Sequence, residues 1–210
     1  MEEKKTCILK IASLNVNGFR ACVRNGFWDW FHKEQPDILC MQEVRMSLEQ
    51  IAEKKNIKMH SPPEGYTLVQ SDADKKGYSG VSIWSRKEIL ESFDSISIEG
   101  MEWANSEGRC VGIRLKDFDV EVWSMYFPSG TSGEVRQSYK DDFLKKIQPW
   151  MSQKITSKVL LCGDFNIAHT ALDLFHDKAN RKKAGYLPHE RDWMTDRIKE
   201  GWVDVWRTHH

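Results

Sequence analysis

The 210-residue sequence lacks the features that would place it in several large classes of protein. No apolar run approaches the roughly 18 residues that a membrane span requires. The first five residues, Met-Glu-Glu-Lys-Lys, do not resemble a signal peptide. There is also no internal repeat, low-complexity tract or linker. We therefore expect a single domain over residues 1–210 with no membrane association, and this length allows a sizeable core.

The cysteines are too scattered for a disulfide framework or a zinc site. They are odd in number, they include no CxxC pair, and they lie at positions 7, 22, 40, 110 and 162. Most fall within apolar, strand-like runs, where reduced thiols are commonly buried. A reducing cytoplasm fits this usage best.

The charge balance excludes overall electrostatic attraction as a basis for binding nucleic acid. The 31 Lys and Arg residues are matched by 31 Asp and Glu residues, so the formal net charge is zero. Any contact with a nucleic acid would need a local basic patch.

Two short apolar runs that each end in an acid are the most informative features. One run begins at Val159 and ends at Asp164, with Asn166 two residues further on; the other runs from Asp37 to Glu43. Their length and composition predict buried strands. Residues i and i+2 of an extended chain face the same side, so Asp164 and Asn166 could address one small polar group. Because buried carboxylates need partners, the acids predict a metal, a cation or a reaction there.

Each acid also has a simpler explanation. Asp164 could form a turn with its own backbone at a strand–loop boundary, and Glu43 could meet solvent beside Arg45. Considered alone, neither acid favours a functional role over this simpler explanation. Two buried strands that both end in carboxylates are nevertheless what a two-sheet enzyme would use to build one divalent site. Few protein ligands and several waters suit Mg²⁺.

The rest of the chain predicts many strands at short intervals with helices between them. Asn25-Gly26 weakens the middle of the first helix, and Ser47 with Gln50 predicts a capping box. This alternation predicts an α/β protein of the α+β type, a two-layer β-sandwich flanked by helices. The expected strands are 7–14, 66–70, 81–85, 111–115, 120–126 and the start of one at 202–206; the expected helices are 19–32, 47–57, 135–153 and 188–200.

Two basic loops are candidates for contact with a phosphate backbone. The loop 72–80 combines two lysines, two glycines and Tyr78, and the loop 177–185 contains Asn180-Arg181-Lys182-Lys183. Taken by themselves, both are more simply explained as solvated surface.

Seven short motifs occur in order from about Ile8 to the end of the chain. They are LNVNGFRA at 14–21, QE at 42–43, GYSGV at 77–81, EGR at 107–109, YFP at 126–128, GDFNIAH at 163–169 and NRKKAG at 180–185. Together they resemble the exonuclease III family of AP endonucleases, within the endonuclease/exonuclease/phosphatase superfamily. Residues 166–174 and 184–191 look nearer the branch dominated by abasic-site cleavage.

The resemblance implies a role for each matching residue. Glu43 resembles the principal metal-ligand carboxylate, with Asn15 and Asn17 behind it. Asp164 resembles the residue that orients or deprotonates the attacking water, and Asn166 the amide that holds this water and a phosphate oxygen. Tyr126 resembles the tyrosine beside the scissile phosphate. Six further residues resemble family positions that bind the DNA backbone: Arg20, Tyr78, Asn180, Arg181, Lys182 and Lys183.

The implied activity is hydrolysis of the phosphodiester 5′ to abasic sites in duplex DNA during base-excision repair. It would depend on Mg²⁺, with Mn²⁺ as an alternative, and include 3′-phosphodiesterase or 3′→5′ exonuclease activity. We expect a monomeric enzyme. Two alternatives stay open: a non-catalytic DNA-binding fragment, and a superfamily phosphoesterase that acts on another substrate, such as a phosphoinositide.

The sequence departs from the family pattern in three places. Ser129 stands where the family usually carries Asn or Gln, and Val44 replaces a common Thr after the metal-ligand Glu. Counterparts of the C-terminal strands, a further metal-site Asp and a closing Ser-Asp-His are absent, so the domain is expected to be incomplete at its C-terminus. Neither His209 nor His210 follows Ser-Asp, and neither is expected to be catalytic.

Overall fold

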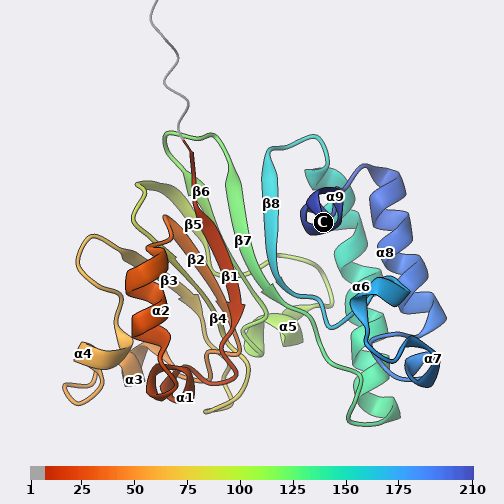
Figure 1. The fold of residues 1–210 in the computed structure, drawn as a ribbon, viewed down its shortest axis with the longest axis horizontal. Coiled ribbons are helices and arrows are strands. Elements are labelled where there is room, and N and C mark those ends of the chain that lie inside the picture. Colours follow the sequence, from red (N-terminus) through yellow and green to blue (C-terminus); the bar gives the residue numbers. More distant parts are fainter. Residues whose placement is uncertain (1–7) are drawn as a thin grey trace, which may run out of the picture.

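Two four-stranded sheets pack face to face, and helices cover their outer faces (Figure 1). The computed structural model describes residues 8–210, so the part of the first predicted strand at Cys7 lies outside the described residues. This arrangement confirms the predicted helix-flanked sandwich. The first sheet has the order β1 (Ile11–Asn15), β2 (Ile38–Gln42), β4 (Val81–Ser85), β3 (Thr67–Ser71); the second has β5 (Ile89–Phe93), β6 (Cys110–Leu115), β7 (Glu121–Tyr126), β8 (Val159–Asp164).

Strand β2 shows how the alternation of side chains builds the layers. Its residues Ile38 and Cys40 join the core between the two sheets, whereas Leu39 and Met41 join the core beneath the first group of helices. Successive side chains of a strand point to opposite faces. Because both faces of β2 are covered, all five of its residues are buried, the four apolar residues and the polar Gln42 at its end.

Four short helices cover the first sheet. The helix predicted over 19–32 is two helices, because Gly26 has a left-handed φ of 95° between them. The capping box at Ser47 and Gln50 is confirmed, but its helix ends at Ala52 and not at Ile57. The four helices are α1 (Phe19–Arg24), α2 (Phe27–Glu34), α3 (Leu48–Ala52) and α4 (Ile57–His60).

The long helix α6 (Glu134–Lys154) covers the second sheet, and α8 (Pro188–Glu200) packs beside it (Figure 1). Helix α6 buries Phe143, Leu144, Ile147 and Met151, and Lys140 is unexpectedly buried with them. Within residues 8–210 no helix is both long and apolar enough to cross a bilayer. The remaining helical segments are α5 (Glu102–Ser106), the 3₁₀ turn η1 (Ala171–Asp173), α7 (Asp177–Asn180) and α9 (Val205–His209).

Two sequence predictions are wrong in detail. The strand expected to start over 202–206 does not form: α9 begins at Val205, because the Asp204 carboxylate accepts a hydrogen bond from the Arg207 backbone N–H and caps a helix. The run that begins at Val159 does form strand β8, but its residues are half-buried, since β8 lies at the edge of its sheet and pairs on one side only. Strand β5 and helix α5 were not predicted at all, and the segment 177–185, predicted as a loop, begins with the short helix α7.

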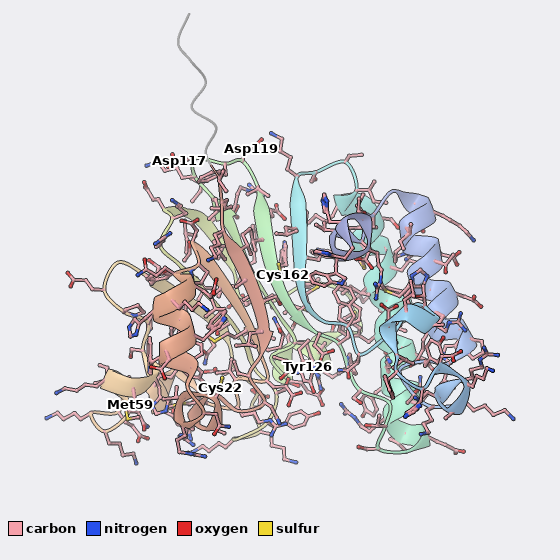
Figure 2. The ribbon with its side chains drawn as sticks, viewed as in Figure 1. Cys22, Met59, Asp117, Asp119, Tyr126 and Cys162 are labelled. Atoms are coloured by element: carbon pink, nitrogen blue, oxygen red, sulfur yellow. The ribbon has the colours of Figure 1, made fainter. Side chains whose placement is uncertain are left out.

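Four strands end at the same end of the sandwich. Strand β1 runs parallel to β2, and β7 runs parallel to β8. In Figure 2, Tyr126 marks this end, whereas Asp117 and Asp119 mark the opposite end. Polar residues that follow these strands are therefore gathered in one place.

Candidate active site

The candidate site lies where β1, β2, β7 and β8 end. Asn15 is the last residue of β1, and Glu43 directly follows β2. Tyr126 and Asp164 are the last residues of β7 and β8, and they are register partners. Because β1 and β2 belong to one sheet and β7 and β8 to the other, the site is built across the sandwich.

The amide of Asn15 joins the two acids. Its Nδ2 lies 2.9 Å from Glu43 Oε1 and also 2.9 Å from Asp164 Oδ2. Its Oδ1 accepts a hydrogen bond from the Asn17 backbone N–H at 2.9 Å. Asn15 thus presents N–H groups to the carboxylates and uses its oxygen within its own turn. The structure brings Glu43 and Asp164 together, which the prediction of one site built from two strand ends requires.

Glu43 is held rigidly and is ionised. It has a left-handed φ of 53°, and its carbonyl accepts from the Gly18 backbone N–H at 2.7 Å. Burial raises the pKa of its carboxyl, but hydrogen bonds from Asn15, Tyr126 and Arg45 outweigh that effect, so the pKa lies below its usual range. Its Oε1 accepts from Asn15 and its Oε2 pairs with the Arg45 guanidinium, so both oxygens of the carboxylate are held in place.

Tyr126 is a neutral hydrogen-bond donor over the whole physiological range. Burial raises its pKa to about 12, and the adjacent Glu43 carboxylate adds to the effect. The guanidinium carbon of Arg109 lies 4.6 Å from the centroid of the Tyr126 ring, which fixes the ring from one face.

Asp164 and Asn166 are close, but not for the reason that their spacing suggests. Asn166 has a left-handed φ of 52° and is not extended, so the argument from i and i+2 does not apply. Instead, the Asn166 backbone N–H donates to Asp164 Oδ1 at 2.9 Å, and Asn166 Nδ2 donates to the Phe127 carbonyl at 2.8 Å. A tight turn therefore places both side chains.

The residues predicted to contact DNA lie on segments that flank this end of the molecule. Arg20 is exposed on α1, and Lys182 and Lys183 are exposed just after α7. Asn180 and Arg181 make contacts within their own segment, to the His176 carbonyl and the Asp177 carboxylate. In Figure 1, α1 and α7 lie on either side of the end where the four strands finish.

Tyr78 belongs to a cluster that the sequence did not reveal. Its hydroxyl accepts from Arg109 Nη2 at 3.0 Å and from Arg136 Nη2 at 2.9 Å, and both guanidinium groups also pair with Glu107. Arg109 is almost fully buried. The sequence feature that marks this cluster is the EGR motif, which contains both Glu107 and Arg109. Only glycine fits between them, because a Cβ on Gly108 would lie 2.6 Å from the Ser71 carbonyl oxygen.

The donor set suits a hard cation that keeps most of its water. Between residues 8 and 210 there is no cluster of three or more His, Cys, Asp or Glu side chains that could hold a metal ion. A structural zinc site of that kind is therefore missing from the described chain. The charged oxygen donors near Asn15 come from Glu43 and Asp164, and so few protein ligands are typical of Mg²⁺.

Comparisons with known proteins agree with this geometry. The profile of the Endonuclease/Exonuclease/phosphatase family matches residues 12–209. The chain is 36% identical over 200 residues to the DNA repair nuclease APEX1 of Danio rerio, covering 95% of this chain and 62% of that protein. It is 33% identical over 201 residues to an exodeoxyribonuclease of Bacillus subtilis (strain 168), covering 95% and 75%.

Solved structures share the fold. An AP endonuclease from Archaeoglobus fulgidus superposes with a TM-score of 0.79 at 25% identity, over 96% of this chain and 74% of that one. The chain spans less than two thirds of the fish relative. These matches confirm the resemblance carried by the seven motifs. The protein is a member of the Endonuclease/Exonuclease/phosphatase family.

Proposed function

We propose that this protein is an AP endonuclease that cleaves the phosphodiester 5′ to abasic sites in duplex DNA. The observation that carries the proposal is the single Asn15 amide within 2.9 Å of carboxylates from both sheets. The names of the relatives, a DNA repair nuclease and an exodeoxyribonuclease, support the same chemistry and a 3′-phosphodiesterase or 3′→5′ exonuclease activity.

Glu43, with Asn15 and Asn17 beside it, would hold the divalent cation, for which Mg²⁺ is preferred and Mn²⁺ is an alternative. When bound, the cation supplies charge that offsets the negative charge developing on the phosphate. Glu43 suits this role because it is ionised and because its backbone is fixed between neighbouring segments.

Asp164 would orient the attacking water and take its proton. Each of its oxygens accepts one protein hydrogen bond, from Asn15 and from the Asn166 backbone, which leaves lone pairs for a water. In the transition state the neutral Tyr126 hydroxyl would turn its hydrogen from Glu43 to a phosphate oxygen, and the second N–H of the Asn166 amide would donate to another.

Exposed cations beside the site would hold the DNA backbone. The chain has no net charge, so this attraction must be local. We assign backbone contacts to Arg20, Tyr78, Asn180, Arg181, Lys182 and Lys183. An abasic nucleotide has no base to unpair, so its extrusion costs less than that of an intact nucleotide. Selectivity for abasic sites then needs no reading of sequence. A monomeric state and a cytoplasmic location stay predictions.

The test is cleavage of a duplex that contains a tetrahydrofuran abasic analogue, followed on a denaturing gel. We expect cleavage with Mg²⁺, none with EDTA, and losses of about 10²–10⁴-fold in Glu43→Ala and Asp164→Asn. Unchanged turnover in either variant would reject the role assigned to that residue. Binding without Mg²⁺-dependent cleavage would favour a non-catalytic DNA-binding protein, and cleavage of inositol phosphates in its place would favour another phosphoesterase.

A further inference from the structure

A buried ion pair lies away from the two acids of the site. Lys140 of α6 and Glu190 of α8 both have fully buried side chains, and Lys140 Nζ lies 2.6 Å from Glu190 Oε1. Isolated charges are expensive to bury, so both groups must be compensated by close partners. The lysine has a second partner, and that partner belongs to the candidate active site.

Lys140 Nζ donates a hydrogen bond of 2.7 Å to the backbone carbonyl of Asn166. Asn166 adopts a left-handed φ of 52°, which a residue other than glycine keeps only when its surroundings hold it there. Gly185 packs on the same carbonyl, because a Cβ at Gly185 would lie 3.1 Å from the Asn166 oxygen. The Asn166 carbonyl is therefore fixed from two directions.

Glu190 is fixed in its turn. Its Oε2 accepts from the Leu187 backbone N–H at 2.9 Å at the start of α8, and its Oε1 accepts from Gln137 Nε2 at 3.2 Å. The ion pair thus ties α6 and the first turn of α8 to the loop that follows β8.

We propose that Lys140 and Glu190 are positioning residues that fix the left-handed backbone of Asn166 for phosphodiester hydrolysis. This inference rests on the proposed function. The Asn166 backbone N–H orients Asp164, and its side chain is anchored on the Phe127 carbonyl. A shift of the Asn166 backbone would move the N–H that holds Asp164 and the side-chain amide together. Neither Lys140 nor Glu190 is exposed to a substrate, so both act only through Asn166.

The main test is the double variant Lys140→Met/Glu190→Gln. It removes the donor to the Asn166 carbonyl without leaving a charge buried alone, and the new amide can still accept from Leu187. We expect kcat on abasic duplex to fall by about ten- to a hundredfold, with KM changed by less than about threefold. Lys145→Met, at an exposed position of the same helix, is the matched control.

A double-mutant cycle distinguishes positioning from general support of the fold. In an Asn166→Ala background, the same pair of substitutions should lower kcat by a smaller factor than in the wild type, because the side-chain amide is already gone and only the backbone N–H that orients Asp164 is left to be positioned. An equal loss in both backgrounds would overturn the proposal.

Gly185→Ala provides a second route if the double variant does not fold. The new Cβ presses on the same carbonyl, and the φ of Gly185 is +87°. Gly65→Ala is matched in backbone strain, since Gly65 has a φ of +86° and no heavy atom lies within 4 Å of the position that its Cβ would take. We expect kcat to fall for Gly185→Ala and not for Gly65→Ala; equal effects would contradict the inference.

A readout that needs no activity separates this inference from the proposed function. The Cα and Cβ chemical shifts of Asn166 report its left-handed backbone, and they should move in Lys140→Met/Glu190→Gln and stay in place in Lys145→Met. If the wild-type protein does not cleave abasic DNA, the proposed function fails while this measurement still tests the positioning. Unchanged shifts would overturn the positioning even in an active enzyme.

Discussion

Single residues at the candidate site are placed by hydrogen bonds between segments far apart in the sequence. Asn15 is the clearest case, because one amide group donates to carboxylates from both sheets. An amide at this position lowers the electrostatic repulsion between Glu43 and Asp164. A carboxylate of nearly the same shape would add to it.

Asn15→Asp should therefore make stability depend on pH. At pH 7 we expect a loss of roughly 2–3 kcal/mol in the free energy of unfolding, because three carboxylates would share one site. In the variant, repulsion raises the folded-state pKa values, so stability falls as pH rises through them and approaches that of the wild type near pH 3. Urea unfolding at pH 3 and pH 7 checks this, with Asn25→Asp, at an exposed position, as the control. An equal loss at both values would contradict the repulsion.

Tyr126→Phe tests the neutral donor at the site. Loss of the hydroxyl should lower kcat by about 10²-fold, the usual effect of removing one transition-state donor. Because the pKa of Tyr126 is raised to about 12, its ionisation should cause no fall in wild-type activity below about pH 11. A pH–rate profile of both proteins checks this. A wild-type profile that falls near pH 10, with a flat profile for the variant, would show that Tyr126 ionises at its ordinary pKa.

Some of these residues could be found from the sequence, and others could not. Glu43, Tyr126 and Asp164 end strand-like runs, and this local pattern is visible in one dimension. Arg109 and Lys140 are buried, but a basic residue beside apolar ones looks like any surface residue of an amphipathic segment. Their partners come from other elements, so burial could be recognised only in three dimensions.

Helices and strands could be predicted where the hydrophobic periodicity of the sequence is strong. They were predicted less well where the pairing of strands decides how buried a segment is. Helix α8 matches its predicted range, because Pro188 begins it and Gly201 ends it in a left-handed conformation. Strand β8 was predicted as buried, yet its apolar sequence does not show that it lies at a sheet edge. The short strand β5 carries too weak a pattern to be detected.

Helix α6 should depend strongly on its buried lysine. Lys140→Met alone leaves Glu190 as a buried charge without its cation, so we expect a loss of about 3–5 kcal/mol in the free energy of unfolding. Lys145→Met, on the exposed face, should change it by less than about 0.5 kcal/mol. Denaturant titrations of both variants make the comparison. Similar stabilities would mean that the Lys140 ammonium and its partner contribute little to the fold.

Strand β7 carries a separate ion-pair cluster at its first residue. Glu121 accepts from Arg114, Lys154 and the Trp123 indole, and these contacts outweigh burial and lower its pKa to about 2. A lowered folded-state pKa stabilises the fold above the ordinary carboxyl pKa, and the contribution is lost as pH falls toward 2. This cluster is therefore a source of acid sensitivity in the fold.

Glu121→Gln should cost roughly 2–3 kcal/mol in unfolding free energy at pH 7 and much less at pH 2. Glu88→Gln, which breaks the exposed pair with Lys116, should cost less than about 1 kcal/mol. Thermal unfolding across this pH range tests both. A loss in Glu121→Gln that does not change with pH would indicate a packing effect and not an electrostatic one.

At the scale of the whole molecule, the fold gathers Asn15, Glu43, Tyr126 and Asp164 at one end of a protein with no net charge. The sequence predicted two sheets and flanking helices, because many short apolar runs alternate with amphipathic ones. It did not give the sheet order, since pairing between β2 and β4 or between β7 and β8 involves strands separated by long segments. That pairing is what gathers the four strand ends into one site.

This arrangement predicts that the salt dependence of DNA binding comes from lysines at one end of the molecule. Lys182→Ala/Lys183→Ala removes two exposed cations near the site, whereas Lys116→Ala/Lys158→Ala removes two near Asp117 and Asp119 at the opposite end (Figure 2). If both Lys182 and Lys183 contact phosphates, the slope of log K against log salt should become shallower by up to about 2, because each contact releases roughly 0.9 counterion. Binding of abasic duplex between about 50 and 200 mM salt, measured in EDTA so that cleavage does not interfere, gives both slopes.

The control pair should leave the slope unchanged, because the far end has no DNA to contact. Equal changes in the two variants would mean that DNA responds to total charge and that the strand ends do not define the interface.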